Sequence, residues 1–202
     1  MTHVVTTFLK NRGSVLLTRR AADADRNSGR WDGLSAPSAG DSQAAATEAR
    51  RLVQDATGRD DLTLEYAGAT VTVTHDGEEW THYPFRFETP TRDLGPMPDV
   101  ADSEWLSPTA IVDRETVPGL WEAYSEIAPS PKTVAADTAH GSAALSIQAL
   151  EVIRDRAAVA DDWQEIADLA TELQDARPSM AVLANRVNSV LSGADRSPSA
   201  VH

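Results

Sequence analysis

Residues 41–58, DSQAAATEARRLVQDATG, decide the fold of the first half of the chain. Gly58 is typical of the position just beyond a helix, so the sequence predicts one helix from about residue 41 to residue 57. Apolar residues recur within it at helical spacing, which indicates one buried face. The stripe predicted to be buried consists of Ala45, Ala49, Leu52 and Ala56.

Extended segments lie on both sides of this helix. Residues 4–9 and 14–19 are rich in β-branched and apolar side chains, and the turn residues 11–13 between them predict a hairpin. Residues 69–74 alternate between apolar and polar side chains, which is the period of a half-buried strand. Residues 80–88 carry aromatic side chains at every second position near their end, which predicts a further strand.

Pro84 interrupts the aromatic segment. Because proline has no N–H to donate to a strand ladder, we expect residues 80–88 to form an edge strand or to contain a bulge. Residues 103–106 predict a short final strand, and residues 120–127 predict a helix. Strand pairs around one central helix, with another helix at the end, predict an α+β sandwich over residues 1–127.

The second half differs in character from the first. Pro129 and Pro131 prevent a helix from continuing, so residues 128–137 are predicted to be a linker. Residues 138–202 predict an all-helical segment that is small for an independent core, and we expect it to be the incomplete front of a longer domain or to dock elsewhere. Its predicted helices cover residues 138–160, 162–176 and 178–193.

The composition disfavours several classes of function. Acidic residues outnumber basic ones 31 to 18, and the net charge of -13 disfavours binding to nucleic acid. Without cysteine the chain can form no disulfide, thiolate metal site or cysteine nucleophile. The sequence has neither a membrane-spanning apolar run nor a secretory signal at its start, so we expect no membrane partner and a cytoplasmic protein. Only two basic residues are lysines, and this acidic composition resembles that of halophilic, archaeal proteins.

Three stretches of the first half carry a family resemblance. They are residues 30–35 (RWDGLS), residues 40–58 and residues 104–108 (EWLSP). Together with the predicted order of strands, these stretches are similar to a Nudix hydrolase. The resemblance implies an α/β/α sandwich with a mixed sheet, and in an active member it implies Mg²⁺-dependent cleavage of a nucleoside diphosphate derivative.

The part of the resemblance that carries the chemistry is degenerate. The Nudix motif ends in Arg-Glu-apolar-any-Glu-Glu-any-Gly, and when its Gly is placed on Gly58 its Arg falls on Arg51. Its three glutamates, which hold the metal, then fall on Leu52, Asp55 and Ala56. The resemblance therefore implies a largely dismantled magnesium site with Asp55 as its remaining metal ligand.

Glu48 is an alternative carboxylate partner for Asp55. Seven helical residues separate the two by about 10.5 Å along the axis, whereas magnesium holds its oxygens at about 2.0–2.1 Å. Two hypotheses for the candidate catalytic residues stay open. In the first, Glu48, Arg51 and Asp55 form an exposed ion-pair face. In the second, Glu48 and Asp55 rebuild a magnesium site with a loop acid such as Asp41.

Other polar residues are candidates for binding a nucleotide or sugar phosphate. Guanidinium groups can contact phosphate oxygens bidentately, although an arginine in a polar loop can also be simply solvated. The candidate arginines are Arg19, Arg20, Arg26 and Arg30. His75 and His82 belong to one predicted hairpin without being cross-strand partners, and we expect surface histidines there rather than metal ligands.

The helical half carries a second resemblance. Residues 133–143 (TVAADTAHGSA), 149–152 (ALEV) and 177–185 (RPSMAVLAN) are similar to the N-terminal helices of the translation initiation factor 2B alpha/beta/delta family, which includes ribose-1,5-bisphosphate isomerase. The resemblance implies that a phosphate is contacted by Arg177, Ser179 and Asn185. A helix start at this point favours an anion, and an ordinary helix start without a ligand is the alternative. The isomerases' catalytic cysteine and aspartate lie beyond this segment.

Three functions remain open from the sequence. The first is a binding or regulatory module for a phosphorylated small molecule, attached to the initiation factor 2B-like segment. The second is an active Nudix pyrophosphohydrolase that uses Mg²⁺. The third is an interaction subunit that joins an initiation factor 2B-like partner or forms a homo-oligomer.

Overall fold

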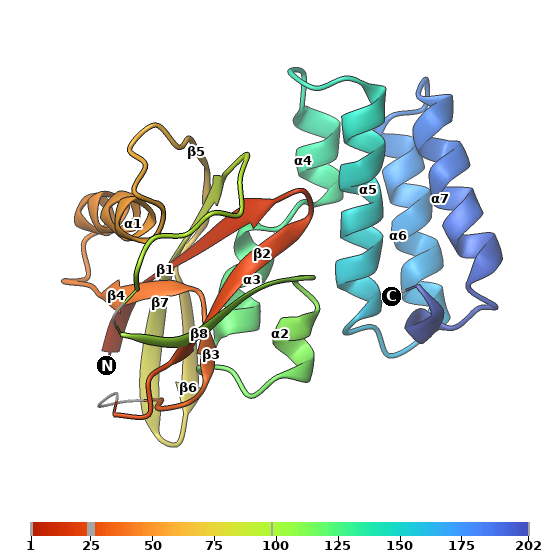
Figure 1. The fold of residues 1–202 in the computed structure, drawn as a ribbon. Helices are drawn as coiled ribbons and strands as arrows, with labels where there is room; N and C mark the ends of the chain where they lie inside the picture. Colours follow the sequence, from red (N-terminus) through yellow and green to blue (C-terminus); the bar gives the residue numbers. More distant parts are fainter. Residues whose placement is uncertain (1, 24–26, 98, 202) are drawn as a thin grey trace. The chain divides into compact units, whose positions relative to one another are not determined.

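A computed structural model describes residues 2–23, 27–97 and 99–201 of the chain (Figure 1). The chain forms two compact units, residues 1–127 and residues 128–202. Within the described ranges, no helix is both long enough and apolar enough to cross a membrane.

The first unit is built around one mixed sheet. Its strands are β1 (Thr2–Asn11), β2 (Ser14–Arg20), β3 (Trp31–Asp32), β4 (Leu34–Pro37), β5 (Leu64–Ala67), β6 (Val71–His75), β7 (Glu78–Glu88) and β8 (Val100–Leu106). The order is β3-β2-β1-β7-β5, with β4 also paired to β1, β6 to β7 and β8 to β2. β1 and β7 run parallel, and the other pairs are antiparallel.

Helices cover both faces of this sheet (Figure 1). They are α1 (Ser42–Thr57), α2 (Ala110–Asp113) and α3 (Leu120–Ile127). α1 packs on the face of β1 and β7 that carries Val5 and Phe85. α3 packs on the opposite face, where the rings of Phe8 and Tyr124 meet edge to face with centroids 5.5 Å apart. The predicted α+β fold, an α/β/α sandwich with a mixed sheet followed by helices, is confirmed.

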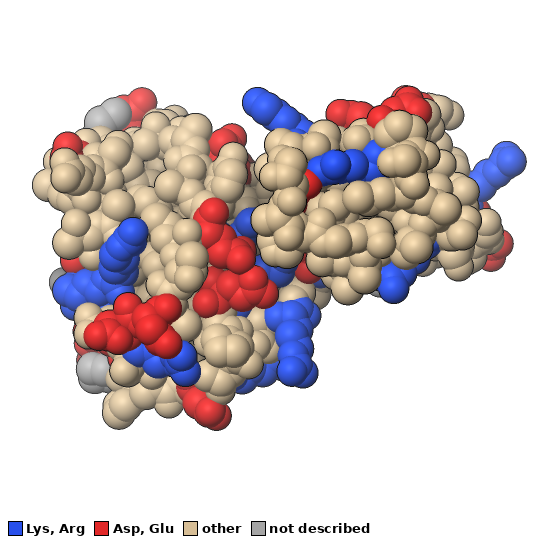
Figure 2. All heavy atoms as spheres, turned by 90° about the horizontal axis from the view of Figure 1, so that it is seen from above, with Lys and Arg blue, Asp and Glu red and all other residues tan. Residues whose placement is uncertain are grey.

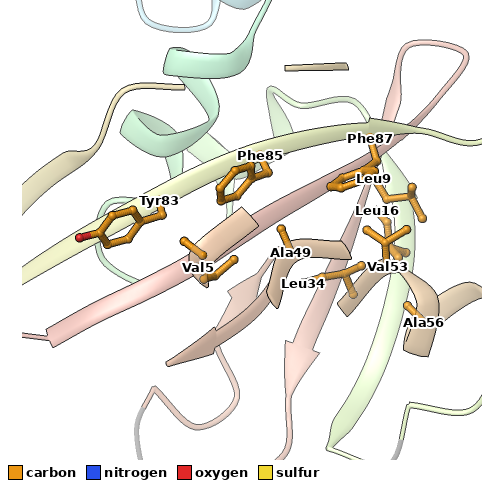
Figure 3. Packing of buried hydrophobic residues seen from close by; sticks show 11 residues of the cluster. Val5, Leu9, Leu16, Leu34, Ala49, Val53, Ala56, Tyr83, Phe85 and Phe87 are labelled. Carbon is orange, nitrogen blue, oxygen red and sulfur yellow. The ribbon is translucent and has the colours of Figure 1, made fainter. Parts of the chain in front are cut away.

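The predicted bounds of α1 and its end at Gly58 are confirmed. The Asp41 carboxylate accepts a hydrogen bond from the N–H of Ala44 at 2.8 Å, and Gly58 adopts a left-handed φ of 69° that glycine takes readily. The buried residues of α1 are Ala45, Ala49, Val53 and Ala56, and Figure 3 shows the last three packed beneath the aromatic side chains of β7. The predicted stripe was wrong for Leu52, which is only half-buried and lies beside this cluster.

β7 is not an edge strand, so that alternative of the Pro84 prediction was wrong. The other alternative, a bulge, is met only in the neighbouring strand, where the ladder of β5 with β7 shifts register within residues 64–66. Along one side β7 pairs with β1, and along the other it pairs with β6 and then β5. Pro84 lies where β6 has ended and β5 has not begun, since the partners of β7 change there from Val71 to Ala67. The missing N–H therefore falls at a break in the neighbouring ladder, and the carbonyl of Pro84 still accepts the N–H of Gly68 at 3.0 Å.

The second unit consists of helices around a separate core. They are α4 (Pro131–Ala136), α5 (Ser142–Ala157), α6 (Trp163–Ala176) and α7 (Ala181–Gly193), followed by a 3₁₀ turn at Pro198–Ala200. The core includes Val134, Ile153, Ile166 and Leu183. The predicted linker 128–137 was wrong, because Ser130 caps a helix whose Val134 is buried in this core. The signal that was missed is a serine N-cap followed by proline at the first helical position, which begins a helix although the proline pair ends the preceding one.

Candidate functional site

The charged side chains on the exposed face of α1 form ion pairs with one another. Arg51 donates to the Glu48 carboxylate from Nε at 3.0 Å and from a terminal nitrogen at 2.5 Å, and its other terminal nitrogen pairs with Asp55. The hydrogen bond from Arg51 lowers the pKa of Glu48, which keeps that carboxylate ionised. The three candidate catalytic residues are therefore brought together. The Arg51 guanidinium lies between the two carboxylates, at the position that the magnesium ion would take in a rebuilt site.

The two other positions of the metal motif face apolar neighbours. Ala56 is 2% exposed within the core cluster, and Leu52 packs against the same cluster. Leu94 and Met97, from the segment after β7, pack there as well, and the N–H of Gly95 donates to the carbonyl of Ala56 at 2.7 Å. A carboxylate at position 56 would lose its hydration without gaining a polar partner.

These residues do not fit a magnesium ion. Asp41 already uses its carboxylate to cap α1, and Glu48 and Asp55 already share Arg51. Throughout the described part of the chain, no group of three or more His, Asp and Glu side chains is placed to hold a metal ion. Each carboxylate that the sequence offered for a rebuilt site has a partner from the protein itself.

A buried carboxylate lies at Asp32, in the short strand β3 between β2 and α1. Asp32 is 3% exposed and pairs across the strands with Thr18 of β2. Its Oδ2 accepts a hydrogen bond from the Ser35 hydroxyl at 2.6 Å and faces Arg20 at 3.3 Å. Its Oδ1 is buried and has no hydrogen-bond partner among the described residues. Burial raises the pKa of Asp32, although Ser35 and Arg20 act in the opposite direction.

Trp31 fixes the strand that carries this carboxylate. Its N–H donates to the carbonyl of Glu115 and its own carbonyl accepts the N–H of Val117, both at 2.9 Å. The guanidinium carbon of Arg114 lies 4.2 Å from the centre of the Trp31 ring, which is within the range of a cation–π contact. The only sequence signal for this short strand was the pair of large apolar residues, Trp31 and Leu34, inside a polar stretch.

His82 is a second buried polar group, and the prediction of a surface histidine was wrong for it. His82 is 1% exposed, and its Nε2 lies 2.8 Å from the carbonyl of Pro118. Because a carbonyl can only accept, we assign the proton to Nε2, which leaves Nδ1 to accept from the Thr6 hydroxyl at 2.8 Å. Burial lowers the pKa of His82, which favours this neutral form. His75 is exposed beside Asp76, as expected.

We expect Asp32→Asn to change how stability depends on pH. Because the folded state holds the Asp32 proton to higher pH than the unfolded chain, the wild type is most stable relative to Asp32→Asn below the ordinary pKa of 3.8. That advantage is lost as pH rises through the raised pKa, by about 1.4 kcal/mol for each unit of pKa shift. Urea unfolding of both proteins from pH 3 upward measures it.

The comparison isolates Asp32, because Arg20 and His82, the charged and titratable groups that act on it, are present in both proteins. A stability difference that stays the same at every pH would contradict a desolvated Asp32.

The arginines predicted to contact phosphate already face acidic residues. The shortest N–O distances are 3.6 Å for Arg19–Asp102, 3.3 Å for Arg20–Asp32 and 3.4 Å for Arg30–Glu115. Arg26 lies outside the described residues. Figure 2 shows the same mixture of charge on the first unit, where groups of basic side chains lie next to acidic ones. A phosphate at these arginines would have to displace a carboxylate.

In the second unit, Arg177 ends α6 and does not start a helix. Its Nε donates to the carbonyl of Val134 at 3.1 Å, and a terminal nitrogen donates to the carbonyl of Asp137. The predicted helix start at residue 178 was wrong, because α7 begins only at Ala181. Ser179 and Asn185 are exposed before and within the first turns of α7. The Arg177 guanidinium thus ties α4 to the end of α6 and already has protein partners.

Comparison with known proteins gives similarity to solved structures alone, since no protein-family model and no curated protein matches the chain. A Nudix hydrolase from M. smegmatis, RenU, is 19% identical over 62% of this chain and 81% of its own, with a TM-score of 0.47. A Nudix hydrolase from Nitrosomonas europaea is 13% identical over 62% and 87%, with a TM-score of 0.48. The Nudix domain of Shewanella oneidensis NrtR, complexed with ADP ribose, is 12% identical over 62% and 84%, with a TM-score of 0.48.

Proposed function

We propose that the first unit binds a small phosphorylated molecule, a nucleotide or sugar phosphate, without hydrolysing it, as a binding or regulatory module attached to the helical unit. The observation that carries this proposal is the set of side chains that α1 presents at the positions of the metal ligands. Residues 52 and 56 are apolar, and Arg51 occupies the space between Glu48 and Asp55. Metal-assisted cleavage needs an ion that polarises the phosphate and activates water, and this helix offers no free pair of carboxylates to hold one.

Two features support a phosphorylated ligand. The stretches at residues 30–35 and 40–58 resemble those of Nudix proteins outside the metal ligands. All but two of the basic residues are arginines, whose planar guanidinium suits phosphate oxygens. The net charge of -13 repels an extended polyanion, but it acts far less on one phosphate group held in a local pocket.

Calorimetric titration tests the binding. ADP-ribose, a nucleoside diphosphate and a ribose phosphate are titrated in molar salt, with and without MgCl₂. We expect at least one to bind with an affinity that magnesium leaves unchanged, because Glu48 and Asp55 are already paired with Arg51. Binding of none of these compounds would overturn the proposal.

Turnover separates this proposal from an active pyrophosphohydrolase. We expect no magnesium-dependent phosphate release above background from the wild type, and the same result from Asp55→Ala. Among the described residues Asp55 pairs with Arg51 alone, on an exposed face, so its removal should leave the fold intact. Release by the wild type that Asp55→Ala abolishes would establish hydrolysis instead.

A further inference from the structure

The β1–β2 hairpin carries an unusual residue at its tip. Arg12 and Gly13 form the two-residue turn, with φ values of 48° and 83°. Turns with two positive φ values favour Asn or Asp followed by Gly, because a residue with a longer side chain is strained in the left-handed region. The turn itself therefore does not explain an arginine at position 12, and strained residues that persist are often functional.

The Arg12 guanidinium is free. Within the described chain it has no hydrogen bond, ion pair or ring contact, in contrast to most arginines of this unit. The hairpin is held instead by Arg92, which donates to Asn11 Oδ1 and to the Ser14 hydroxyl, each at 3.0 Å. Arg12 is thus available to a ligand without any loss of support for the turn.

An open cavity of about 350 Å³ lies beside Arg12, and we call it the hairpin pocket. Its lining residues are Asn11, Arg12, Glu88, Thr89 and Pro90. The pocket is held in shape by Asn11, which is 4% exposed and donates from Nδ2 to the carbonyl of Thr89 at 2.8 Å. Its volume lies at the lower end of the range of about 300–1,000 Å³ for small-molecule sites.

The charges around the hairpin pocket favour an anion. Lys10 lies opposite Glu88 in the parallel register of β1 and β7, and Glu65, which also acts on Glu88, pairs with Arg86 at 3.3 Å. Three basic side chains, Lys10, Arg12 and Arg86, therefore accompany two carboxylates. A hydrogen bond with Glu65 raises the pKa of Glu88, and burial adds to the rise. In a chain with a net charge of -13, this is a local site where positive charge prevails.

We propose that the hairpin pocket holds the phosphate group of the ligand and that Arg12 contacts its oxygens. This inference rests on the proposed function and adds to it a site at the hairpin tip, formed by the ends of β1 and β7. Arg12 provides the bidentate hydrogen bonds, and Glu88 limits the negative charge that the pocket accepts to a single small phosphate group.

Arg12→Asn tests the pocket, with inorganic phosphate and ADP-ribose as the probes in calorimetry. We expect binding to weaken by about 10-fold or more, since a charged hydrogen bond is lost. The thermal midpoint should stay the same or rise, because asparagine tolerates a φ of 48° better than arginine. Arg50→Gln is the matched control: Arg50 is an exposed arginine of α1, so this variant removes the same charge elsewhere and should bind like the wild type.

Glu88→Gln provides the opposite change. The amide can still hydrogen-bond to Glu65 while one negative charge leaves the pocket, so we expect phosphate to bind several-fold more tightly. Wild-type binding that Arg12→Asn leaves intact, or that falls equally in Arg50→Gln, would overturn the pocket and leave the proposed function standing. Failure of the wild type to bind either probe, or any other phosphorylated compound, would overturn both.

Discussion

Ala56→Glu is expected to lower the free energy of unfolding of the first unit by about 3 kcal/mol or more. This substitution places a glutamate where the motif that the sequence resembles has one, but Ala56 is 2% exposed within the apolar cluster under α1. The new carboxylate has to remain in that cluster without a partner or force α1 away from the sheet. Urea unfolding measures the loss, since four of the five tryptophans lie in this unit.

Gln54→Glu is the matched control, because it adds the same charge to an exposed position of the same helix. We expect it to change stability by less than about 0.5 kcal/mol. The Ala56→Glu protein could instead unfold like the wild type and bind magnesium in calorimetry. That result would show that a single substitution is enough to form a metal site. That outcome would contradict the apolar role assigned to residue 56.

Gly119→Ala is expected to be the other strongly destabilising change, at about 2–4 kcal/mol. Gly119 has a φ of 79°, and a Cβ there would lie 2.7 Å from Val73 Cγ2 and 2.8 Å from His82 Nε2. The methyl group would push His82 away from the carbonyl of Pro118, which is its hydrogen-bond partner. The break would leave buried polar groups unpaired.

Gly77→Ala separates the two causes of this loss. Gly77 has the same φ of 79°, but a Cβ there meets no atom within 4 Å. We therefore expect it to lose only the cost of the backbone conformation, about 1–2 kcal/mol. Equal losses in the two variants would mean that the contact with His82 and Val73 costs nothing.

Local signals accounted for the elements that bear on function most directly. Gly58 predicted the end of α1, because a glycine just beyond a helix acts only on the turn that precedes it. Residues 11–13 predicted the β1–β2 hairpin for the same reason. The motif alignment placed Leu52 and Ala56 where glutamates belong, and the structure places both beside the core.

Residues whose surroundings come from distant parts of the chain could not be predicted in this way. Asp32 is buried only because β2 and the segment around residue 116 enclose β3. His82 is buried because β1 lies parallel to β7 and the loop before α3 reaches its ring. Pro84 is tolerated in a central strand only because its neighbours change at that point.

The sequence by itself determined the bounds of α1, the alternation of side chains along the strands, the α+β class and the apolar residues at positions 52 and 56. Each of these depends on residues close together in the chain. Only the tertiary structure decided which polar groups lose water and which charges find partners. Burial depends on what other strands and helices cover. Asp32 therefore became a buried carboxylate, while Arg12 lies beside the hairpin pocket with no partner among the described residues.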